Sequence, residues 1–422
     1  MKKETFARAA VVAAAIAIAM PVYAQDALSL PHKYENPTGK EFPIMAWYSV
    51  PGGKSTKERF QELRAAGFNL SMHPSEDEEA LGKTLDLALG TGVKLMASHY
   101  KDFCGNPAPT VKKYRKHKAL AGWFLKDEPQ MQEFASLAEA ARKVRAVDDS
   151  HILYLNLFPY VYDRSRPEVE IPCFGANSYD EYVQKFIDSV KLGMISYDMY
   201  PVITNGGWLH LKPEYYHNLE VISTKARKAG IPFWAFSLAT CHNTNVDHYP
   251  VATREQIRLQ IFSDLAYGAQ GIQYFTYWNP GNADFEYSNA PIAGGKRTEV
   301  YDIISDINHE VQRLSWVFLG AKMQDVSHTG DSIAWRVKRL ATLPQQFSEV
   351  STNGSDIVVS QFTNGKRRFL MVLSADIVNR QQVTVKAADG VKRILPDGTS
   401  VKASLYNSSL WLSPGDYLLF EY

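Results

Sequence analysis

Between residues 42 and 314 the chain alternates between two hydrophobic patterns. Short runs of apolar, β-branched or aromatic residues are each followed by a longer stretch with apolar residues at helical spacing. The short runs predict eight strands, at 42–50, 68–74, 94–100, 119–127, 152–158, 193–201, 231–239 and 271–278. The longer stretches predict eight helices, at 55–66, 76–90, 109–118, 130–146, 178–190, 213–229, 253–268 and 298–314.

Local signals support the helix ends. Ser55 with Glu58 and Thr253 with Gln256 have the spacing of capping boxes, and Gly230 follows a basic last turn. Eight strand-then-helix units in about 270 residues match the size and order of a (β/α)₈ barrel. A doubly wound sheet would also alternate in this way. Eight repeats, with polar or aromatic residues at nearly every strand's C-terminal end, favour the barrel.

Beyond residue 319 the hydrophobic period changes to two. Runs such as RRFLMVLSA and DYLLFEY are separated by turn signals, among them Asn364-Gly365 and Pro414-Gly415. This pattern predicts a small all-β sandwich domain at 319–422, after a barrel domain at 25–318. The expected role of the sandwich is packing or accessory sugar binding.

The first residues have the features of a secretory signal peptide. Lys2 and Lys3 precede an apolar run at 9–20, and Val22-Tyr23-Ala24 resembles a cleavage site. We therefore expect residues 1–24 to be removed and the protein to be exported, to the periplasm or the medium. No later apolar stretch is long enough to predict a membrane span.

Composition excludes several function classes. Lys and Arg number 46 against 45 Asp and Glu, so no strong net charge attracts the chain to nucleic acid or an anionic membrane. No motif implies a cofactor, and Cys104, Cys173 and Cys241 lack zinc-site spacing, although one disulfide among them is possible. Aromatic residues make up 12% of the chain. Sugar clefts use such residues, but large cores bury many as well.

In a barrel of this kind, chemistry takes place at the C-terminal ends of the strands. The predicted ends carry carboxylates, imidazoles, amides and aromatic rings, and they lack the glycine loop of a phosphate site. The residues predicted to contact substrate are Tyr48, His73, His99, Asp127, Asn156, Tyr200, Ser237 and Trp278.

The run ALAGWFLKDEPQ ends an apolar strand on two adjacent carboxylates, Asp127 and Glu128. Such a pair is costly to bury unless it is hydrogen-bonded, paired or open to a cleft. Cleavage of a glycosidic bond needs an acid for the leaving oxygen and a second carboxylate across the sugar. We predict that Glu128 is the general acid/base and that Asp127 raises its pKa or binds a sugar hydroxyl. The alternative is that Glu128 caps a helix that has Pro129 in its first turn.

Four motifs, GWFLKDEP, ISYDMYP, IPFWAFSLA and AYGAQGIQYFTYW, resemble the clan of barrel glycoside hydrolases that includes the β-galactosidases. The resemblance implies an acid/base at Glu128, with Asp127 in place of the clan's Asn. It also implies a nucleophilic Glu at the end of the seventh strand, where this chain has Ser237.

The second carboxylate must therefore come from elsewhere. Asp198 is the leading candidate, because SYDMYP resembles the sixth strand of chitinase-like barrels. Asp247, Asp284 and Glu286 lie on later loops and stay open as candidates.

The sequence thus predicts an exported glycoside hydrolase that acts on oligo- or polysaccharides through Glu128 and Asp198, as base or nucleophile. One alternative is a barrel that binds carbohydrate but has lost turnover. A weaker one is a carbohydrate esterase that uses Ser237 with His242 and Asp247.

Overall fold

The computed structural model describes residues 32–160, 172–281, 285–354 and 356–422 of the chain. The predicted signal peptide and Asp284 lie outside the described residues. Among those described, none of the helices combines the length and the apolar character that crossing a bilayer requires. Cys104, Cys173 and Cys241 are all described, and no disulfide joins any two of them.

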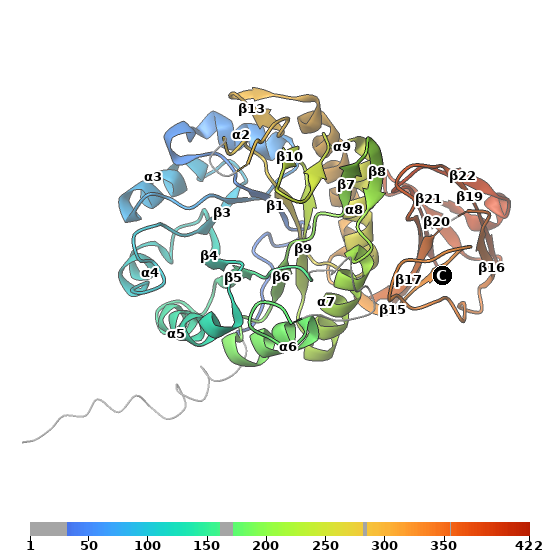
Figure 1. The fold of residues 1–422 in the computed structure, drawn as a ribbon, viewed down its shortest axis with the longest axis horizontal. Coiled ribbons are helices and arrows are strands. Elements are labelled where there is room, and N and C mark those ends of the chain that lie inside the picture. Colours follow the sequence, from blue (N-terminus) through green and yellow to red (C-terminus); the bar gives the residue numbers. More distant parts are fainter. Residues whose placement is uncertain (1–31, 161–171, 282–284, 355) are drawn as a thin grey trace, which may run out of the picture.

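Eight parallel strands form a barrel in the order β5-β4-β3-β2-β1-β12-β9-β6 (Figure 1). Leu157 closes it, because it bridges Tyr197 and its N–H donates to the Ser196 carbonyl oxygen at 2.8 Å. Each strand falls within its predicted range: β1 Ile44–Trp47, β2 Leu70–Met72, β3 Lys94–Ala97, β4 Leu120–Asp127, β5 Ile152–Asn156, β6 Ile195–Tyr197, β9 Phe233–Leu238 and β12 Ile272–Phe275.

A helix follows each barrel strand, and the helices surround the barrel in Figure 1. Seven lie within their predicted ranges and α4 begins one residue early. They are α2 Lys57–Ala65, α3 Glu78–Ala88, α4 Ala108–Tyr114, α5 Phe134–Arg145, α6 Tyr179–Val190, α7 Tyr215–Ala229, α8 Arg254–Ala266 and α9 Glu299–Arg313. The fold class is therefore confirmed as a (β/α)₈ barrel followed by antiparallel β-sheets.

The helix ends follow the predicted signals with one correction. Thr253 and Gln256 form the capping box of α8, and Gly230 ends α7 in the left-handed conformation. The N-cap of α2 is Thr56, not Ser55, since Thr56 accepts a hydrogen bond from the Arg59 N–H.

The strands of the barrel bury both of their faces. On β9, Trp234 and Phe236 belong to the cluster inside the barrel, whereas Phe233 and Ala235 pack with the surrounding helices. This alternation follows from the period of two along a strand. It fixes which side chains of each strand can reach the open end of the barrel.

After β6 and β9 the chain builds a second, small sheet at the C-terminal end of the barrel. Its strands are β7 Val202–Asn205, β8 Trp208–Leu211, β10 His242–Asn243 and β11 His248–Tyr249, in the order β10-β11-β7-β8. Strands β7 and β8 form a hairpin, with Gly206 and Gly207 at positive φ in its turn.

The C-terminal part contains two antiparallel sheets packed around their own core, including Val359, Leu370 and Phe420. Their strands are β15 Lys322–Thr329, β16 Phe347–Thr352, β17 Ile357–Asn364, β18 Arg367–Ser374, β19 Gln381–Ala387, β20 Lys392–Ile394, β21 Ser400–Lys402, β22 Leu410–Leu412 and β23 Tyr417–Glu421. The short helix α10 Ser315–Phe318 precedes them.

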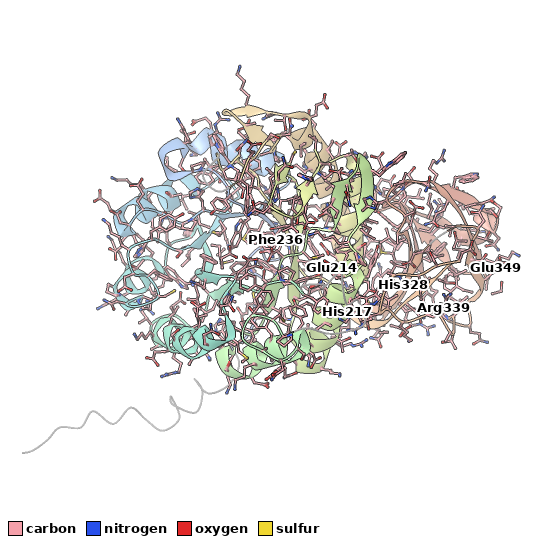
Figure 2. The ribbon with its side chains drawn as sticks, in the orientation of Figure 1. Glu214, His217, Phe236, His328, Arg339 and Glu349 are labelled. Atoms are coloured by element: carbon pink, nitrogen blue, oxygen red, sulfur yellow. The ribbon has the colours of Figure 1, made fainter. Side chains whose placement is uncertain are left out.

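Helix α8 joins this β region to the barrel and is buried along nearly its whole length. Its Arg258 pairs with Glu310 of α9 at 2.6 Å and with Asp416 of the β region at 3.1 Å. His328 of β15, labelled in Figure 2, is fully buried between the Tyr267 hydroxyl at 2.8 Å and the Asp356 carboxylate at 2.7 Å. These polar contacts across the boundary fix how the two parts meet.

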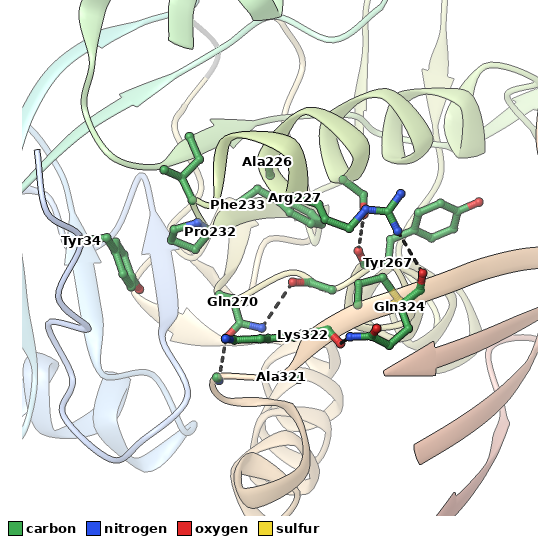
Figure 3. Close-up of a pocket in the computed structure, with 16 residues that line it drawn as sticks. Tyr34, Ala226, Arg227, Pro232, Phe233, Tyr267, Gln270, Ala321, Lys322 and Gln324 are labelled. Carbon is green, nitrogen blue, oxygen red and sulfur yellow. Dashed lines mark hydrogen bonds between the residues drawn. The ribbon is translucent and has the colours of Figure 1, made fainter. Parts of the chain in front are cut away.

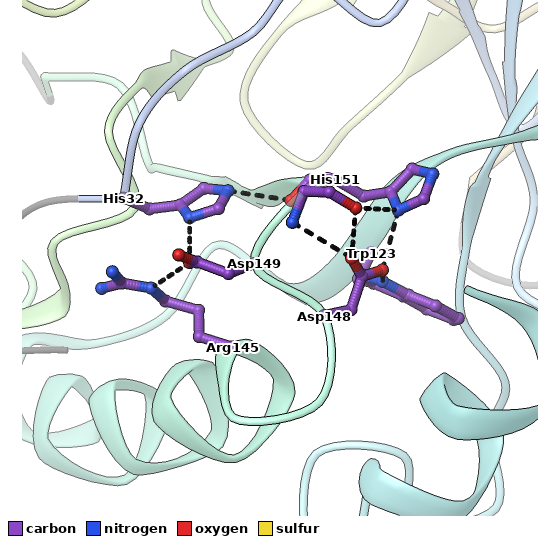
Figure 4. A network of polar contacts seen from close by, with 7 residues as sticks. His32, Trp123, Arg145, Asp148, Asp149 and His151 are labelled. Carbon is purple, nitrogen blue, oxygen red and sulfur yellow. Dashed lines mark hydrogen bonds and ion pairs between the residues drawn. The ribbon is translucent and has the colours of Figure 1, made fainter. Parts of the chain in front are cut away.

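A buried polar network anchors the start of the described chain (Figure 4). His32 contacts Asp149 at 3.0 Å and the His151 carbonyl oxygen at 2.8 Å. Next to it, Asp148 accepts hydrogen bonds from the Trp123 indole and contacts the His151 ring. The network ties residue 32 to the loop between α5 and β5.

Candidate active site

The end of β4 carries the two adjacent carboxyl groups. The pairing of β4 with β5 is irregular between Phe124 and Asp127, and Asp127 then pairs with Asn156. Glu128 follows with φ 45, and its N–H donates to the Asn156 carbonyl oxygen at 2.9 Å. A bulge redirects side chains, and a non-glycine residue at positive φ costs about 1–3 kcal/mol. This strained turn lies where barrel chemistry is expected.

Asn156, at the end of β5, holds two of the carboxylates. Its Nδ2 donates to Asp198 Oδ1 at 2.8 Å and to Asp127 Oδ1 at 3.2 Å. Its Oδ1 accepts a hydrogen bond from Ser196 Oγ at 3.0 Å, and Ser196 in turn accepts one from the Gln273 amide at 2.8 Å. Because this chain of hydrogen bonds fixes the amide, it also fixes the two carboxylates.

The carboxyl groups of Glu128 and Asp198 are hydrogen-bonded to each other. Burial raises the pKa of Glu128 most, and the negative charges of Asp198 and Asp127 raise it further. Burial and the charge of Asp127 also raise the pKa of Asp198, against the hydrogen bonds from Asn156 and Glu128. Both pKa values are therefore raised, that of Glu128 more than that of Asp198, so Glu128 is the member of the pair that stays protonated near neutral pH.

Asp127 lies at the open side of this group and is exposed to solvent. The protein atoms around its carboxyl group nevertheless raise its pKa to about 6, and the Asn156 hydrogen bond and Lys126 oppose that rise. At neutral pH Asp127 is mostly ionised, so its charge acts on both members of the Glu128–Asp198 pair.

The three carboxyl groups line a cavity of about 300 Å³ at the C-terminal end of the barrel. Aromatic side chains form most of its remaining wall, with contributions from the barrel, the small sheet and the loop after β12. They are Trp47, Tyr200, Phe236, Tyr249, Phe275, Phe285 and Tyr287. Aromatic walls with a few convergent polar groups are typical of small-molecule sites.

Lys212, which directly follows β8 of the small sheet, is a cation that lines this cavity. Its Nζ pairs with Asp247 at 2.6 Å and donates to the Tyr249 hydroxyl at 2.8 Å. Asp247 is therefore engaged in an ion pair and is not among the cavity-lining residues. Glu286 is exposed and does not line the cavity either. Among the residues that the structure describes, Asp198 is thus the candidate for the second carboxylate, because it lies beside Glu128 in the cavity.

A second cavity, of about 470 Å³, lies on the other side of Asp127, over the ends of β1 to β4. Trp47 and Asp127 line both cavities. Tyr48 and His99, both predicted to contact substrate, line this second cavity.

Two other predicted contacts lie behind the cavity walls. The His73 ring packs edge-on against the Tyr48 ring with 5.9 Å between centroids, but His73 lines neither cavity. Trp278 is almost fully buried, and the Arg59 guanidinium lies 5.2 Å from its ring centroid. Trp278 is thus too buried for the predicted substrate contact, whereas that of the half-buried His73 stays a prediction.

Ser237 requires the clearest correction. Phe236 points into the barrel, where its ring lies 5.2 Å from that of Trp47, so the next residue on β9 faces the outer layer. Ser237 is fully buried and its Oγ has no hydrogen-bond partner. It neither lines the cavity nor can act from there as an esterase nucleophile. The side chain that β9 presents to the cavity near its end is Phe236.

The sequence did not point to Lys212 or Tyr249 as cavity residues. Tyr249 belongs to the small sheet and Lys212 directly follows its strand β8. The one local signal for that sheet is the turn sequence Asn205-Gly206-Gly207. The position of these residues depends on how that sheet folds over the barrel end.

A larger cavity, of about 580 Å³, lies elsewhere (Figure 3). It is bounded by α7, by residues just before β9 such as Pro232, and by Lys322 of β15. This is the N-terminal end of the strands, where barrel residues serve stability. We therefore place the candidate active site at the smaller cavity with the three carboxyl groups.

Comparisons with known proteins bear on the class of protein. The glycoside hydrolase 42 family model, described as β-galactosidase, matches residues 173–314, about a third of the chain. The match runs from before α6 to the end of α9 and includes Asp198. No curated protein matches the chain in sequence.

Solved structures of glycosidases share the fold. A β-galactosidase from Bacillus circulans sp. alkalophilus matches with a TM-score of 0.60 and 9% identity, over 90% of this chain and 99% of that one. A glycoside hydrolase family 5 protein from Bacteroides vulgatus ATCC 8482 matches with a TM-score of 0.53 and 10% identity, over 90% and 88%.

A β-galactosidase from the psychrophilic Marinomonas ef1 has a TM-score of 0.49 at 12% identity, over 65% of this chain. The chain spans 60% of that enzyme's length. At these identities the structural likeness shows the fold. With the family-model match, it confirms the predicted resemblance to a distant β-galactosidase-like barrel and supports a glycoside hydrolase.

Proposed function

We propose that the protein hydrolyses O-glycosidic bonds of oligo- or polysaccharides, with Glu128 as general acid/base. The observation that carries the proposal is that the Glu128 and Asp198 carboxyl groups line one aromatic-walled cavity at the C-terminal end of the barrel. A glycosidase acid must be protonated at working pH, and burial beside two carboxylates keeps Glu128 protonated.

In the proposed reaction the bond between the anomeric carbon and the leaving oxygen breaks. The leaving oxygen takes the Glu128 proton, and water supplies the new hydroxyl group at the anomeric carbon. The proton of that water returns to the carboxylates, so the net reaction is hydrolysis. Asp198 is the proposed base or nucleophile, and Asn156 holds its carboxylate in place through the 2.8 Å hydrogen bond.

One observation favours a second candidate, a barrel that binds carbohydrate without cleaving it. The described carboxyl groups that line the cavity come from the ends of β4 and β6, while β9 presents Phe236 opposite them. A hydrogen-bonded pair is closer than the about 5–5.5 Å that separates the two carboxyl groups of retaining enzymes. Two carboxyl groups this close leave no room for the sugar between them, so the cavity would bind a sugar without cleaving it.

The experiment is hydrolysis of a broad panel of plant, microbial and host oligosaccharides by the purified chain, with product analysis. Asp198→Asn is measured beside the wild type, and Glu286→Gln serves as an exposed carboxylate control. Turnover by the wild type and the control, but not by Asp198→Asn, supports the proposal. No turnover, together with calorimetric binding of a panel sugar, favours the binding protein.

Export belongs to the same proposal. Its support is the basic and apolar N-terminal segment with its cleavage-site pattern. Mass spectrometry of the mature protein tests it, and the proposal expects a chain that starts at Gln25.

A further inference from the structure

The second cavity is a separate space that adjoins the catalytic one. Trp47 and Asp127 form the common wall, so a molecule that fills both cavities passes directly over Asp127. The volume of about 470 Å³ lies within the range of about 300–1,000 Å³ of small-molecule sites. The proposed reaction uses only the first cavity, so the second needs its own occupant.

Two tyrosines at the edge of this second cavity are unusually exposed. Tyr100, just after β3, is 65% exposed, and Tyr48, just after β1, is 36% exposed. Core packing does not explain rings that remain this open to solvent. They come from two different strand ends, those of β1 and β3.

The backbone under both rings is well anchored. The Tyr100 N–H donates to the Ser75 carbonyl oxygen at 2.9 Å, and the Tyr48 carbonyl oxygen accepts from the Trp278 N–H at 3.0 Å. Tyr48 also holds φ 40, in the left-handed region that non-glycine residues seldom adopt. Exposed rings on a fixed backbone form a preorganised surface, which lowers the entropy cost of binding.

The remaining wall mixes apolar and polar groups. Phe124 and Phe103 lie beside Ser98, His99 and Asp102. A pyranose ring has the matching character, because its C–H faces are apolar and its rim carries hydroxyl groups. This composition fits a neutral sugar better than a purely apolar ligand.

We propose that this second cavity binds the sugar on the leaving-group side of the scissile bond, with Tyr100 as a specificity-determining residue. The inference rests on the proposed function and assigns the leaving-group sugar of its oligo- or polysaccharide substrate to this second cavity. The first cavity takes the sugar that carries the anomeric carbon, since Asp198 and Phe236 there are 8% and 2% exposed. The more open second cavity suits a product that leaves first.

The test compares substrates that share one glycon but differ in leaving group. The pairs are β-galactosyl fluoride with lactose, β-glucosyl fluoride with cellobiose, β-xylosyl fluoride with xylobiose and α-glucosyl fluoride with maltose. Fluoride is too small to use the second cavity, whereas the second sugar of each disaccharide must occupy it. The measured quantity is the ratio of kcat/KM for the disaccharide to kcat/KM for the fluoride.

Tyr100→Ala should lower this ratio by about tenfold or more. The variant loses the contact of the Tyr100 ring with the second sugar, and this contact stabilises the transition state of the disaccharide but not that of the fluoride. Trp411→Ala, which removes a 56% exposed ring from β22, should leave the ratio unchanged. Tyr48→Ala is the second test variant, and thermal melting checks that each variant folds.

An unchanged ratio in both tyrosine variants would overturn the inference. So would a wild type that hydrolyses a fluoride but none of the disaccharides. If the wild type hydrolyses no compound of either kind, the proposed function fails and the inference fails with it.

Discussion

The carboxyl group of Glu128 is hydrogen-bonded to that of Asp198, and burial together with the neighbouring Asp127 carboxylate raises the pKa of both groups. The two residues end different strands, β4 and β6, that are 70 positions apart in the sequence. Asn156 lies between them on β5 and orients Asp198. The protonation of this pair determines the pH range in which the proposed chemistry can work.

Removing the charge of Asp127 should move the whole pH profile. Its carboxylate raises the pKa of both Glu128 and Asp198, so Asp127→Asn should lower both values. Activity needs Glu128 protonated and Asp198 ionised, so both limbs of the kcat/KM profile should shift to lower pH. The check is a profile with a hydrolysed panel substrate. Asp188→Asn, on the exposed face of α6, is the control, and unshifted limbs in Asp127→Asn would contradict the argument.

Removing the Asn156 amide should have the opposite effect on the acid limb. Asn156 donates to Asp198 and lowers its pKa, so Asn156→Ala should raise that pKa. Asp198 then ionises only at higher pH, and the acid limb moves upward. We also expect kcat to fall by about tenfold or more because the carboxylate is no longer held in place. A lower kcat with an unmoved acid limb would mean that Asn156 acts on something other than Asp198.

Ser237→Ala should leave hydrolysis unchanged. The hydroxyl group is buried on the outer side of β9 without a hydrogen-bond partner. Its removal relieves an unsatisfied polar group, so the free energy of unfolding should stay equal or rise by about 1 kcal/mol. Denaturant unfolding and panel hydrolysis measure both effects. Lost activity in a well-folded Ser237→Ala would return Ser237 to the site.

Asp148 should make stability depend on acid pH. Burial raises its pKa, but hydrogen bonds with His151, Trp123 and Ser150 outweigh burial and hold the pKa below its usual value. A depressed folded pKa stabilises the protein above the unfolded value of about 3.9, and this contribution is lost as pH falls. Asp148→Asn should cost about 1–3 kcal/mol at pH 7 and flatten the acid dependence.

Urea unfolding at pH 7 and at lower pH measures this effect. Asp306→Asn, which breaks an exposed ion pair with Arg254, should cost less than about 1 kcal/mol and keep the wild-type pH dependence. Equal losses in the two variants would show that the Asp148 network does not carry the stability.

The sequence was sufficient for the barrel because its strands are apolar runs buried on both faces and most of its helices have apolar residues at helical spacing. Helix α8 is the exception, since it is buried nearly all round. The carboxyl ends of parallel strands meet at one end of a barrel. That rule alone places Asp127, Glu128, Asn156 and Asp198 at the same end, as the structure does.

The details that failed depend on single-residue register and on tertiary contacts. Neighbouring residues of a strand face opposite sides, so a shift of one residue along β9 decides whether Phe236 or Ser237 faces the cavity. A continuous apolar run does not indicate which of the two faces inward. The strands of the small sheet are two to four residues long, too short for a hydrophobic period. Trp278 is at the predicted strand end but is covered by Arg59.

The most direct measurement is the dependence of kcat/KM on leaving-group pKa in Glu128→Gln, for aryl glycosides of the sugar that the wild type prefers. An acid is needed most by poor leaving groups. The variant should therefore lose about 10²–10⁴-fold on the least acidic phenols and much less on dinitrophenyl glycosides. That pattern, in a variant with wild-type thermal stability, would establish Glu128 as the general acid. Equal loss on all leaving groups, or wild-type rates throughout, would contradict the assignment.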